Sequence, residues 1–267
     1  MTKNGKGRKD LRELVFVVFS TLLGACMGSF LNAVALRTVE ERPWWGAERS
    51  RCFACDQVLG PLELVPLLSW LFLGGRCRTC GAKIPLRYPL AELAGAVTAG
   101  LLAWRWGLTF TGFFALATGF ILLLNALTDL YSGYIYDAFA LVLGAVGLLL
   151  RSAGGWGALL DGLAGALAGA GVIILIIVIS RGGMGWGDAW LMAGTGAALG
   201  LQLTLVSLYL GFIFGGIVAL ALLAMKIVKR KDPIPLGPFL AFGAFLALVW
   251  GPALWGWFDF AVKWPWS

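Results

Sequence analysis

The sequence contains no histidine. This absence excludes Ser-His-Asp and Cys-His catalysis, HExxH zinc hydrolysis and any histidine proton relay. Charged residues are also scarce, because they make up 13% of the 267 residues whereas hydrophobic residues make up 60%. A soluble domain of this length needs far more polar surface, so the composition predicts a membrane protein with several spans. Acid–base chemistry must then come from Asp, Glu, Lys, Tyr or Cys.

Long apolar runs, separated by glycine, proline or charged residues, predict an all-α polytopic membrane protein with about eight transmembrane helices. Each span needs about 20 apolar residues, and fewer where neighbouring protein shields its ends. The sixth run is the shortest and is rich in Gly and Ala. The predicted spans are residues 14–36, 89–106, 109–129, 134–150, 158–180, 188–201, 203–228 and 237–258.

A polar insert, residues 37–88, separates the first two spans and carries four of the five cysteines. Cys52 and Cys55 form one CxxC pair, and Cys77 and Cys80 form a second, with twenty-one residues between the pairs. This spacing is typical of a zinc-ribbon site with four cysteine ligands to Zn²⁺. Four protein ligands leave no position for water, so the predicted zinc is structural. Two disulfides, or reduced structural thiols, are the alternative.

The predicted organisation has three parts. Residues 1–36 are an N-terminal segment with the first span, residues 37–88 are the zinc insert, and residues 89–267 are the membrane domain. Basic loops stay in the cytoplasm, and a cytoplasmic insert places 13 Lys and Arg residues inside and eight outside. Five of those eight lie within the first twelve residues and argue against this orientation. We place the insert in the cytoplasm.

Two aspartates lie at the edges of apolar segments, where a carboxylate is costly and therefore suggests a function. Asp129 ends the third predicted span, and Asp188 begins the sixth, so both reach the same membrane face. Carboxylates at one depth can share a proton and hydrolyse a peptide bond, as an aspartyl protease does. Gly185 and Gly187, in the GxGD pattern before Asp188, would let an extended substrate backbone approach.

Other interpretations of these residues stay open. Gly185 and Gly187 can serve helix packing alone, with Asp188 as a helix cap. Asp137 competes with Asp129, because it lies eight residues later at the start of the fourth predicted span. Asp161 is expected at the start of a helix on the outer side of the membrane. A transporter with intramembrane aspartates, or a zinc-stabilised scaffold, would be an alternative function.

Seven segments, in order, resemble the type IV prepilin peptidase family, whose bifunctional members are leader peptidases and N-methyltransferases. No single string decides the resemblance, but their order makes chance implausible. Two departures are Phe53 and Tyr136, which stand where the family usually has proline. The segments are GSFLN at 28–32, SRCFAC at 50–55, LVPLLSWL at 64–71, RCRTC at 76–80, RYPLAEL at 87–93, GMGWGD at 183–188 and PLGPFL at 235–240.

The resemblance implies that Asp129 and Asp188 are the catalytic pair, with Gly185, Gly187 and Asp137 as supporting parts of the active-site motif. It implies a multi-pass protein of the bacterial inner membrane that works at the cytoplasmic face. The implied partners are prepilins or type II secretion pseudopilins and the lipid bilayer, and not nucleic acid. The leader would be cut after Gly, and the new N-terminus would be methylated from S-adenosylmethionine. A peptidase without methyltransferase activity is the alternative.

The sequence indicates the methyl-donor site only weakly. Glu92 lies just inside the second predicted span and would hold the substrate amine, although pairing with an arginine such as Arg87, or simple snorkelling to the interface, would explain it as well. Gly28, Ser29 and Asn32 are a second set of candidates, and close helix packing accounts for Gly and Ser there equally well.

Overall fold

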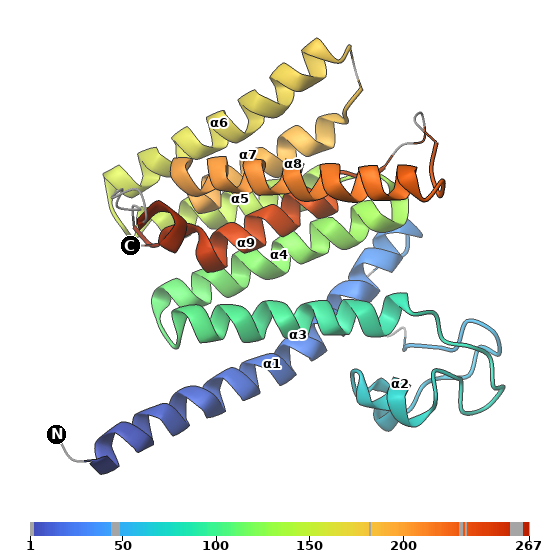
Figure 1. Cartoon of the computed structure of the whole chain (residues 1–267). Helices are drawn as coiled ribbons and strands as arrows, with labels where there is room; N and C mark the ends of the chain where they lie inside the picture. The colour runs from blue at the N-terminus through green and yellow to red at the C-terminus, as the bar shows by residue number, and fades with distance from the viewer. Residues whose placement is uncertain are drawn as a thin grey trace. The chain divides into compact units, whose positions relative to one another are not determined.

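The apolar runs of the sequence form long helices (Figure 1). The structure is a computed structural model that describes residues 3–43, 49–181, 183–229, 232, 234–256 and 264–266. Over these residues it contains α-helices, one short 3₁₀ helix and two isolated β-bridges, and no strand. The all-α prediction is therefore confirmed for the part of the chain that the structure describes. The predicted end of the last span, at residue 258, lies outside the described residues.

Five helices are long and apolar enough to cross a membrane, so the chain is a multi-pass membrane protein. They are α1 over Leu11–Val39, α4 (Phe110–Ser132), α6 (Trp156–Ile179), α8 (Leu201–Ala224) and α9 over Gly237–Leu254. The other three predicted spans coincide with α3 (Arg87–Trp106), α5 (Asp137–Ser152) and α7 (Trp186–Leu199). At 1.5 Å per residue, α5 and α7 reach only about 24 and about 21 Å, which is less than the hydrocarbon core of about 30 Å. The count of eight spans stays a prediction.

The chain divides into two units, Met1–Gly107 and Leu108–Ser267. In the first unit, α1 (Lys3–Val39) packs along α3 through small residues. A Cβ atom on Gly95 would lie 2.6 Å from the Cα atom of Gly28, so the two backbones approach as closely as glycine allows. Between these helices the chain forms η1 (Pro61–Leu64) and α2 (Leu68–Phe72).

In the second unit, α7 is packed between α5 and α6 and has ten of its 14 residues buried. Glycines on both neighbours allow this contact. A Cβ atom on Gly147 of α5 would lie 2.7 Å from the Cα atom of Ala198, and one on Gly165 of α6 would lie 2.7 Å from the carbonyl carbon of Gly200. Because α7 is surrounded by protein, it can be short and rich in Gly and Ala. Helix α9 packs on α4 and α8.

Candidate active site and metal site

The second unit brings Asp129 and Asp188 together, although 59 positions separate them in the sequence. Asp129 lies in the last turns of α4 and is 4% exposed, and Asp188 lies in the first turn of α7 and is 8% exposed. Helices α4 and α7 contact each other, and the two carboxylates interact electrostatically. The site therefore consists of two buried carboxylates from different helices.

Helix ends place both aspartates. Helix α4 ends at Gly133, which adopts the left-handed conformation (φ 70°) and donates its N–H to the carbonyl oxygen of Asp129 at 2.8 Å. Helix α7 begins after Gly185, whose extended backbone (φ −76°, ψ 145°) is that of an N-cap. Asp188 follows in the first turn, where the helix dipole favours a carboxylate.

Gly237, at the start of α9, contributes a contact that the sequence did not predict. Its backbone N–H donates to Oδ2 of Asp129 at 2.9 Å. A Cβ atom at this position would lie 2.6 Å from the same oxygen and 3.0 Å from Cδ1 of Ile135. Only glycine fits without a shift of the carboxylate. The PLGPFL segment marked the region of Gly237 in the sequence, but nothing in that pattern predicted a contact with Asp129.

The supporting residues differ in what they contact. Gly187 packs against Ile135, because a Cβ atom there would lie 2.9 Å from Cβ of Ile135. Gly185 has space around it, and the closest atom to a Cβ there would be Oδ2 of Asp188 at 3.6 Å. Asp137 begins α5 and is exposed, unlike Asp129. Close packing thus accounts for Gly187, while the space beside Gly185 remains open next to the Asp188 carboxylate.

In the first unit the four predicted cysteines form one cluster. The sulfur atoms of Cys52, Cys55, Cys77 and Cys80 all lie within 4.8 Å of one another, and those of Cys52 and Cys80 are 3.9 Å apart. A tetrahedral site with Zn–S bonds of about 2.3 Å requires sulfur atoms about 3.8 Å apart. All five cysteines are free thiols, so the cluster contains no disulfide. The donor set therefore fits a metal ion with four thiolate ligands.

The two halves of the cluster have the same backbone turn. Asp56 donates its N–H to the carbonyl oxygen of Cys52, and Gly81 donates to that of Cys77, both at 2.9 Å. Asp56 and Gly81 both have positive φ, at 55° and 71°. The backbone N–H groups of Cys80 and Thr79 lower the pKa of the Cys77 thiol to about 7. A lowered thiol pKa favours the thiolate that a metal ion requires at Cys77. The hydrogen bond from the Gln57 backbone lowers the pKa of the Cys55 thiol, but burial and the neighbouring thiols outweigh it and raise that pKa to about 12, so the fit to a metal ion rests on the geometry of the four sulfur atoms.

The candidates for methyl transfer surround one cavity of about 1130 Å³ in the first unit. Its lining includes Ser29, Asn32, Glu92 and three cysteines of the cluster, Cys52, Cys55 and Cys77. The Glu92 carboxylate accepts two hydrogen bonds, from Oγ of Ser29 at 2.8 Å and from the backbone N–H of Leu67 at 2.7 Å. Gly28 does not line the cavity and instead faces the backbone of α3. A Cβ atom added to Gly28 would lie 3.0 Å from the Cα atom of Glu92.

Each of the two units contains a match to a known protein family model. Residues 22–106 match the Bacterial Peptidase A24 N-terminal domain, and residues 114–220 match the Type IV leader peptidase family. The chain belongs to the type IV leader peptidase family. The leader peptidase match contains Asp129 and Asp188, and the N-terminal match contains the four cysteines and Glu92.

Named relatives agree with this family over most of their length. The Prepilin leader peptidase/N-methyltransferase of Stutzerimonas stutzeri is 33% identical over 265 residues, which is 89% of this chain and 92% of the relative. The protein of the same name from Pseudomonas aeruginosa is 34% identical over 89% and 91%, and that from Bacillus subtilis is 33% identical over 78% and 84%. No solved structure matches the chain. As a type IV leader peptidase, the chain is an enzyme of the prepilin peptidase class with an N-methyltransferase activity.

Proposed function

We propose that this chain removes the leader of type IV prepilins or type II secretion pseudopilins with Asp129 and Asp188, and then methylates the new N-terminus. The burial of both carboxylates at one site, formed by α4 and α7, carries the peptidase proposal. The relatives are named for both activities. Gly185 has no side chain and lies next to the Asp188 carboxylate, so an extended peptide backbone could approach that carboxylate there.

The proposed chemistry needs one ionised and one protonated carboxyl. When two carboxylates meet around a substrate they share one proton, so the ionised and protonated forms are present together and belong to the pair as a whole. The ionised carboxylate accepts a proton from water while the water oxygen attacks the scissile carbonyl carbon. The protonated carboxyl donates its proton to the carbonyl oxygen. The tetrahedral intermediate then collapses, the C–N bond breaks, and the leaving amine takes up a proton.

The proposed topology has eight spans in the bacterial inner membrane, with the insert and the aspartates at the cytoplasmic face. The third and sixth proposed spans run in opposite directions, which supports the placement of Asp129 and Asp188 at one face. The distribution of Lys and Arg supports the cytoplasmic assignment. We divide the chain functionally into residues 1–36, the zinc insert 37–88, and the membrane domain 89–267 with the peptidase site.

We assign methyl transfer to the cavity beside Glu92. S-adenosylmethionine supplies an activated methyl group on a sulfonium, and an α-amine with a pKa of about 8 is partly neutral in the cytoplasm. The amine nitrogen forms a bond to the methyl carbon, the C–S bond breaks, and the amine loses a proton. The Glu92 carboxylate would hold the amine in place, and Ser29 would orient Glu92. Zn²⁺ on the four cysteines would keep the cavity wall in shape.

The peptidase proposal is tested by the products that the purified protein makes from a synthetic prepilin peptide. We expect a mature peptide that begins directly after the leader Gly. With S-adenosylmethionine present, the mature peptide should also gain one methyl group at its new N-terminus. Mass spectrometry with fragmentation locates both changes. An intact peptide, or a cut elsewhere, would contradict the proposed reaction.

Glu92→Gln tests the methyl-transfer site separately. The amide can still accept from Leu67 and contact Ser29, so the substitution removes the charge and leaves the hydrogen-bonding shape. We expect methylation of an already mature peptide to fall about tenfold or more, because the amine loses its counter-charge. Cleavage should stay near the unaltered rate. An unchanged methylation rate would show that the Glu92 charge has no role there.

A further inference from the structure

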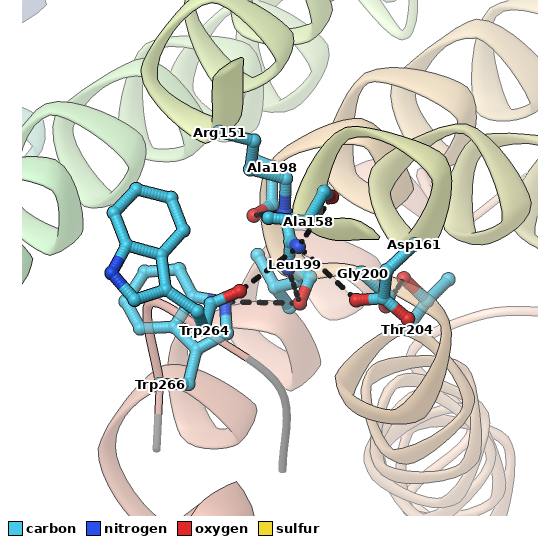
Figure 2. Close-up of polar contacts among 9 residues, drawn as sticks. All are labelled: Arg151, Ala158, Asp161, Ala198, Leu199, Gly200, Thr204, Trp264 and Trp266. Atoms are coloured by element: carbon cyan, nitrogen blue, oxygen red, sulfur yellow. Dashed lines mark hydrogen bonds and ion pairs between the residues drawn. The ribbon is translucent and has the colours of Figure 1, made fainter. Parts of the chain in front are cut away.

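Arg151, in the last turn of α5, is completely buried and has acceptors on every side (Figure 2). Its Nη1 atom donates to Oδ2 of Asp161 at 3.1 Å and to the carbonyl oxygens of Ala158 at 3.0 Å and Trp264 at 3.1 Å. Asp161 is itself buried, in the second turn of α6. A buried guanidinium is costly, and a paired carboxylate with satisfied donors is what makes it tolerable.

The remaining donors of Arg151 cap the end of α7. Its Nε atom donates to the carbonyl oxygen of Ala198 at 3.0 Å, and its Nη2 atom donates to that of Leu199 at 2.6 Å. The last carbonyl groups of a helix have no partner within the helix, and this helix end is buried. Nε1 of Trp266 donates to the same Leu199 oxygen at 2.9 Å (Figure 2).

The C-terminal residues 264–266 link this cap to the beginning of α4. Trp266 packs on Phe114 with ring centroids 5.1 Å apart, and Trp264 stacks on Phe110 at 5.7 Å. Oγ1 of Thr111 donates to the carbonyl oxygen of Pro265 at 3.0 Å. We call Arg151, Asp161 and residues 264–266 the clasp. The clasp holds the last turn of α7 and the first turns of α4.

These are the two helices that carry Asp188 and Asp129 at their opposite ends. Asp188 lies ten residues before Ala198, about 15 Å along α7, and Asp129 lies fifteen residues after Phe114, about 23 Å along α4. A helix transmits a shift at one end to the other, because its backbone is hydrogen-bonded throughout. The relative placement of the two carboxylates therefore depends on how the clasp joins the two far ends.

We propose that Arg151 is a positioning residue for the peptidase, which acts through the clasp to align Asp129 with Asp188. This inference rests on the proposed roles of the two aspartates. A displacement of about 1 Å from a remote substitution can cost about a hundredfold in rate. Neither Asp161 nor Arg151 touches the proposed reaction site, so their effect on cleavage has to come through the helices.

Arg151→Lys and Trp266→Phe test this role. Lysine keeps the charge opposite Asp161 but cannot reach Ala198 and Leu199 with a planar fork. We expect the kcat of prepilin cleavage to fall about tenfold to a hundredfold with KM within twofold. Trp266→Phe keeps a ring against Phe114 and removes only the N–H donor to Leu199, so we expect a smaller fall in kcat of the same kind. Ser152→Ala is the control, because Ser152 is the exposed neighbour of Arg151 and its hydroxyl donates to the Leu149 carbonyl oxygen of its own helix.

Methylation of an already mature peptide separates positioning from general loss of structure. The folded variants should methylate at the unaltered rate while they cleave slowly. An unchanged kcat, a raised KM alone, or a parallel loss of both activities in folded protein would overturn the inference. If Arg151→Lys does not fold, an unchanged kcat in Trp266→Phe would by itself overturn the inference.

Asp188→Asn, assayed alongside, distinguishes this inference from the proposed function. If Asp188→Asn is inactive and Arg151→Lys cleaves normally, the role of Arg151 alone is wrong. If Asp188→Asn cleaves normally, the aspartate pair is wrong and the positioning role fails with it.

Discussion

The two units expose their polar groups very differently. In the first unit, Glu92 and three of the four clustered cysteines line a cavity of about 1130 Å³, and two of the four cysteines are exposed. In the second unit, Asp129 and Asp188 are almost completely buried, and so is the Arg151–Asp161 ion pair. The first unit therefore offers a preformed cavity of the size that small ligands use. The second unit offers a pair of carboxylates that are buried among helices, so a peptide substrate must enter between the helices to reach them.

This difference in exposure suits the two reactions, peptide cleavage and N-methylation, for which the relatives are named. A small methyl donor and a metal ion need an accessible and fixed set of donors. Peptide hydrolysis by aspartates needs a shared proton, which burial and proximity favour. If the units divide the work in this way, substitutions in one should leave the other activity intact.

The largest expected effect is the loss of cleavage in Asp129→Asn. We expect the rate to fall by about a thousandfold, because acid–base catalysis needs both carboxyls. Methylation of an already mature peptide should be unchanged. The matched comparison is Asp137→Asn, which alters the exposed aspartate eight residues later. If Asp137 only supports the motif, cleavage should fall far less in this variant than in Asp129→Asn. If Asp137→Asn abolished cleavage and Asp129→Asn did not, the catalytic role would belong to the exposed Asp137. The catalytic pair would then not consist of two buried carboxylates.

The second effect is on the metal of the first unit. Cys52→Ser should reduce bound zinc from about one ion per chain to none, because a three-cysteine remnant loses the closed tetrahedral site. Hydrogen exchange should speed up in residues 49–86 and stay unchanged in α4 to α9.

The control for this substitution is Cys26→Ser, which alters a cysteine of α1 outside the cluster. Its metal content should equal that of the unaltered protein. Zinc retained in Cys52→Ser would contradict a site with four cysteine ligands.

The smallest expected effect comes from Gly237→Ala. The added methyl group would approach Oδ2 of Asp129 to 2.6 Å, so the carboxylate must shift. We expect cleavage to fall about tenfold, with methylation unchanged. Gly216→Ala in α8 adds the same methyl group where no atom lies within 4 Å, and should cleave normally. Equal rates in the two variants would show that Gly237 does not hold Asp129 in place.

Features with local signals were predictable from the sequence. The CxxC spacing predicted that Cys52, Cys55, Cys77 and Cys80 would meet, because each pair sits on a single tight turn. Apolar runs predicted where helices occur, and the start of α9 at Gly237 matches the predicted residue. Helix α1 begins well before the predicted span, at Lys3, because hydropathy marks the membrane and not the helical backbone.

Features that depend on distant contacts were not predictable. Asp161 was expected to be an outer helix-start residue, and nothing near it in the sequence indicated that it would be buried with Arg151. The carbonyl groups that Arg151 caps lie more than forty positions away, at Ala198 and Leu199. Gly237 likewise contacts Asp129 across 108 positions. Such contacts follow from how helices pack, which depends on many weak interactions at once.

The most direct test of the central claim compares the residual cleavage of Asp129→Asn, Asp188→Asn and the variant with both changes. Single-turnover rates on one prepilin peptide, with the folded fraction measured for each protein, give the three values. If the two carboxylates work as one unit, the double variant should be no slower than the slower single variant, within about threefold. A double variant whose loss equals the product of the two single losses would contradict a shared catalytic site.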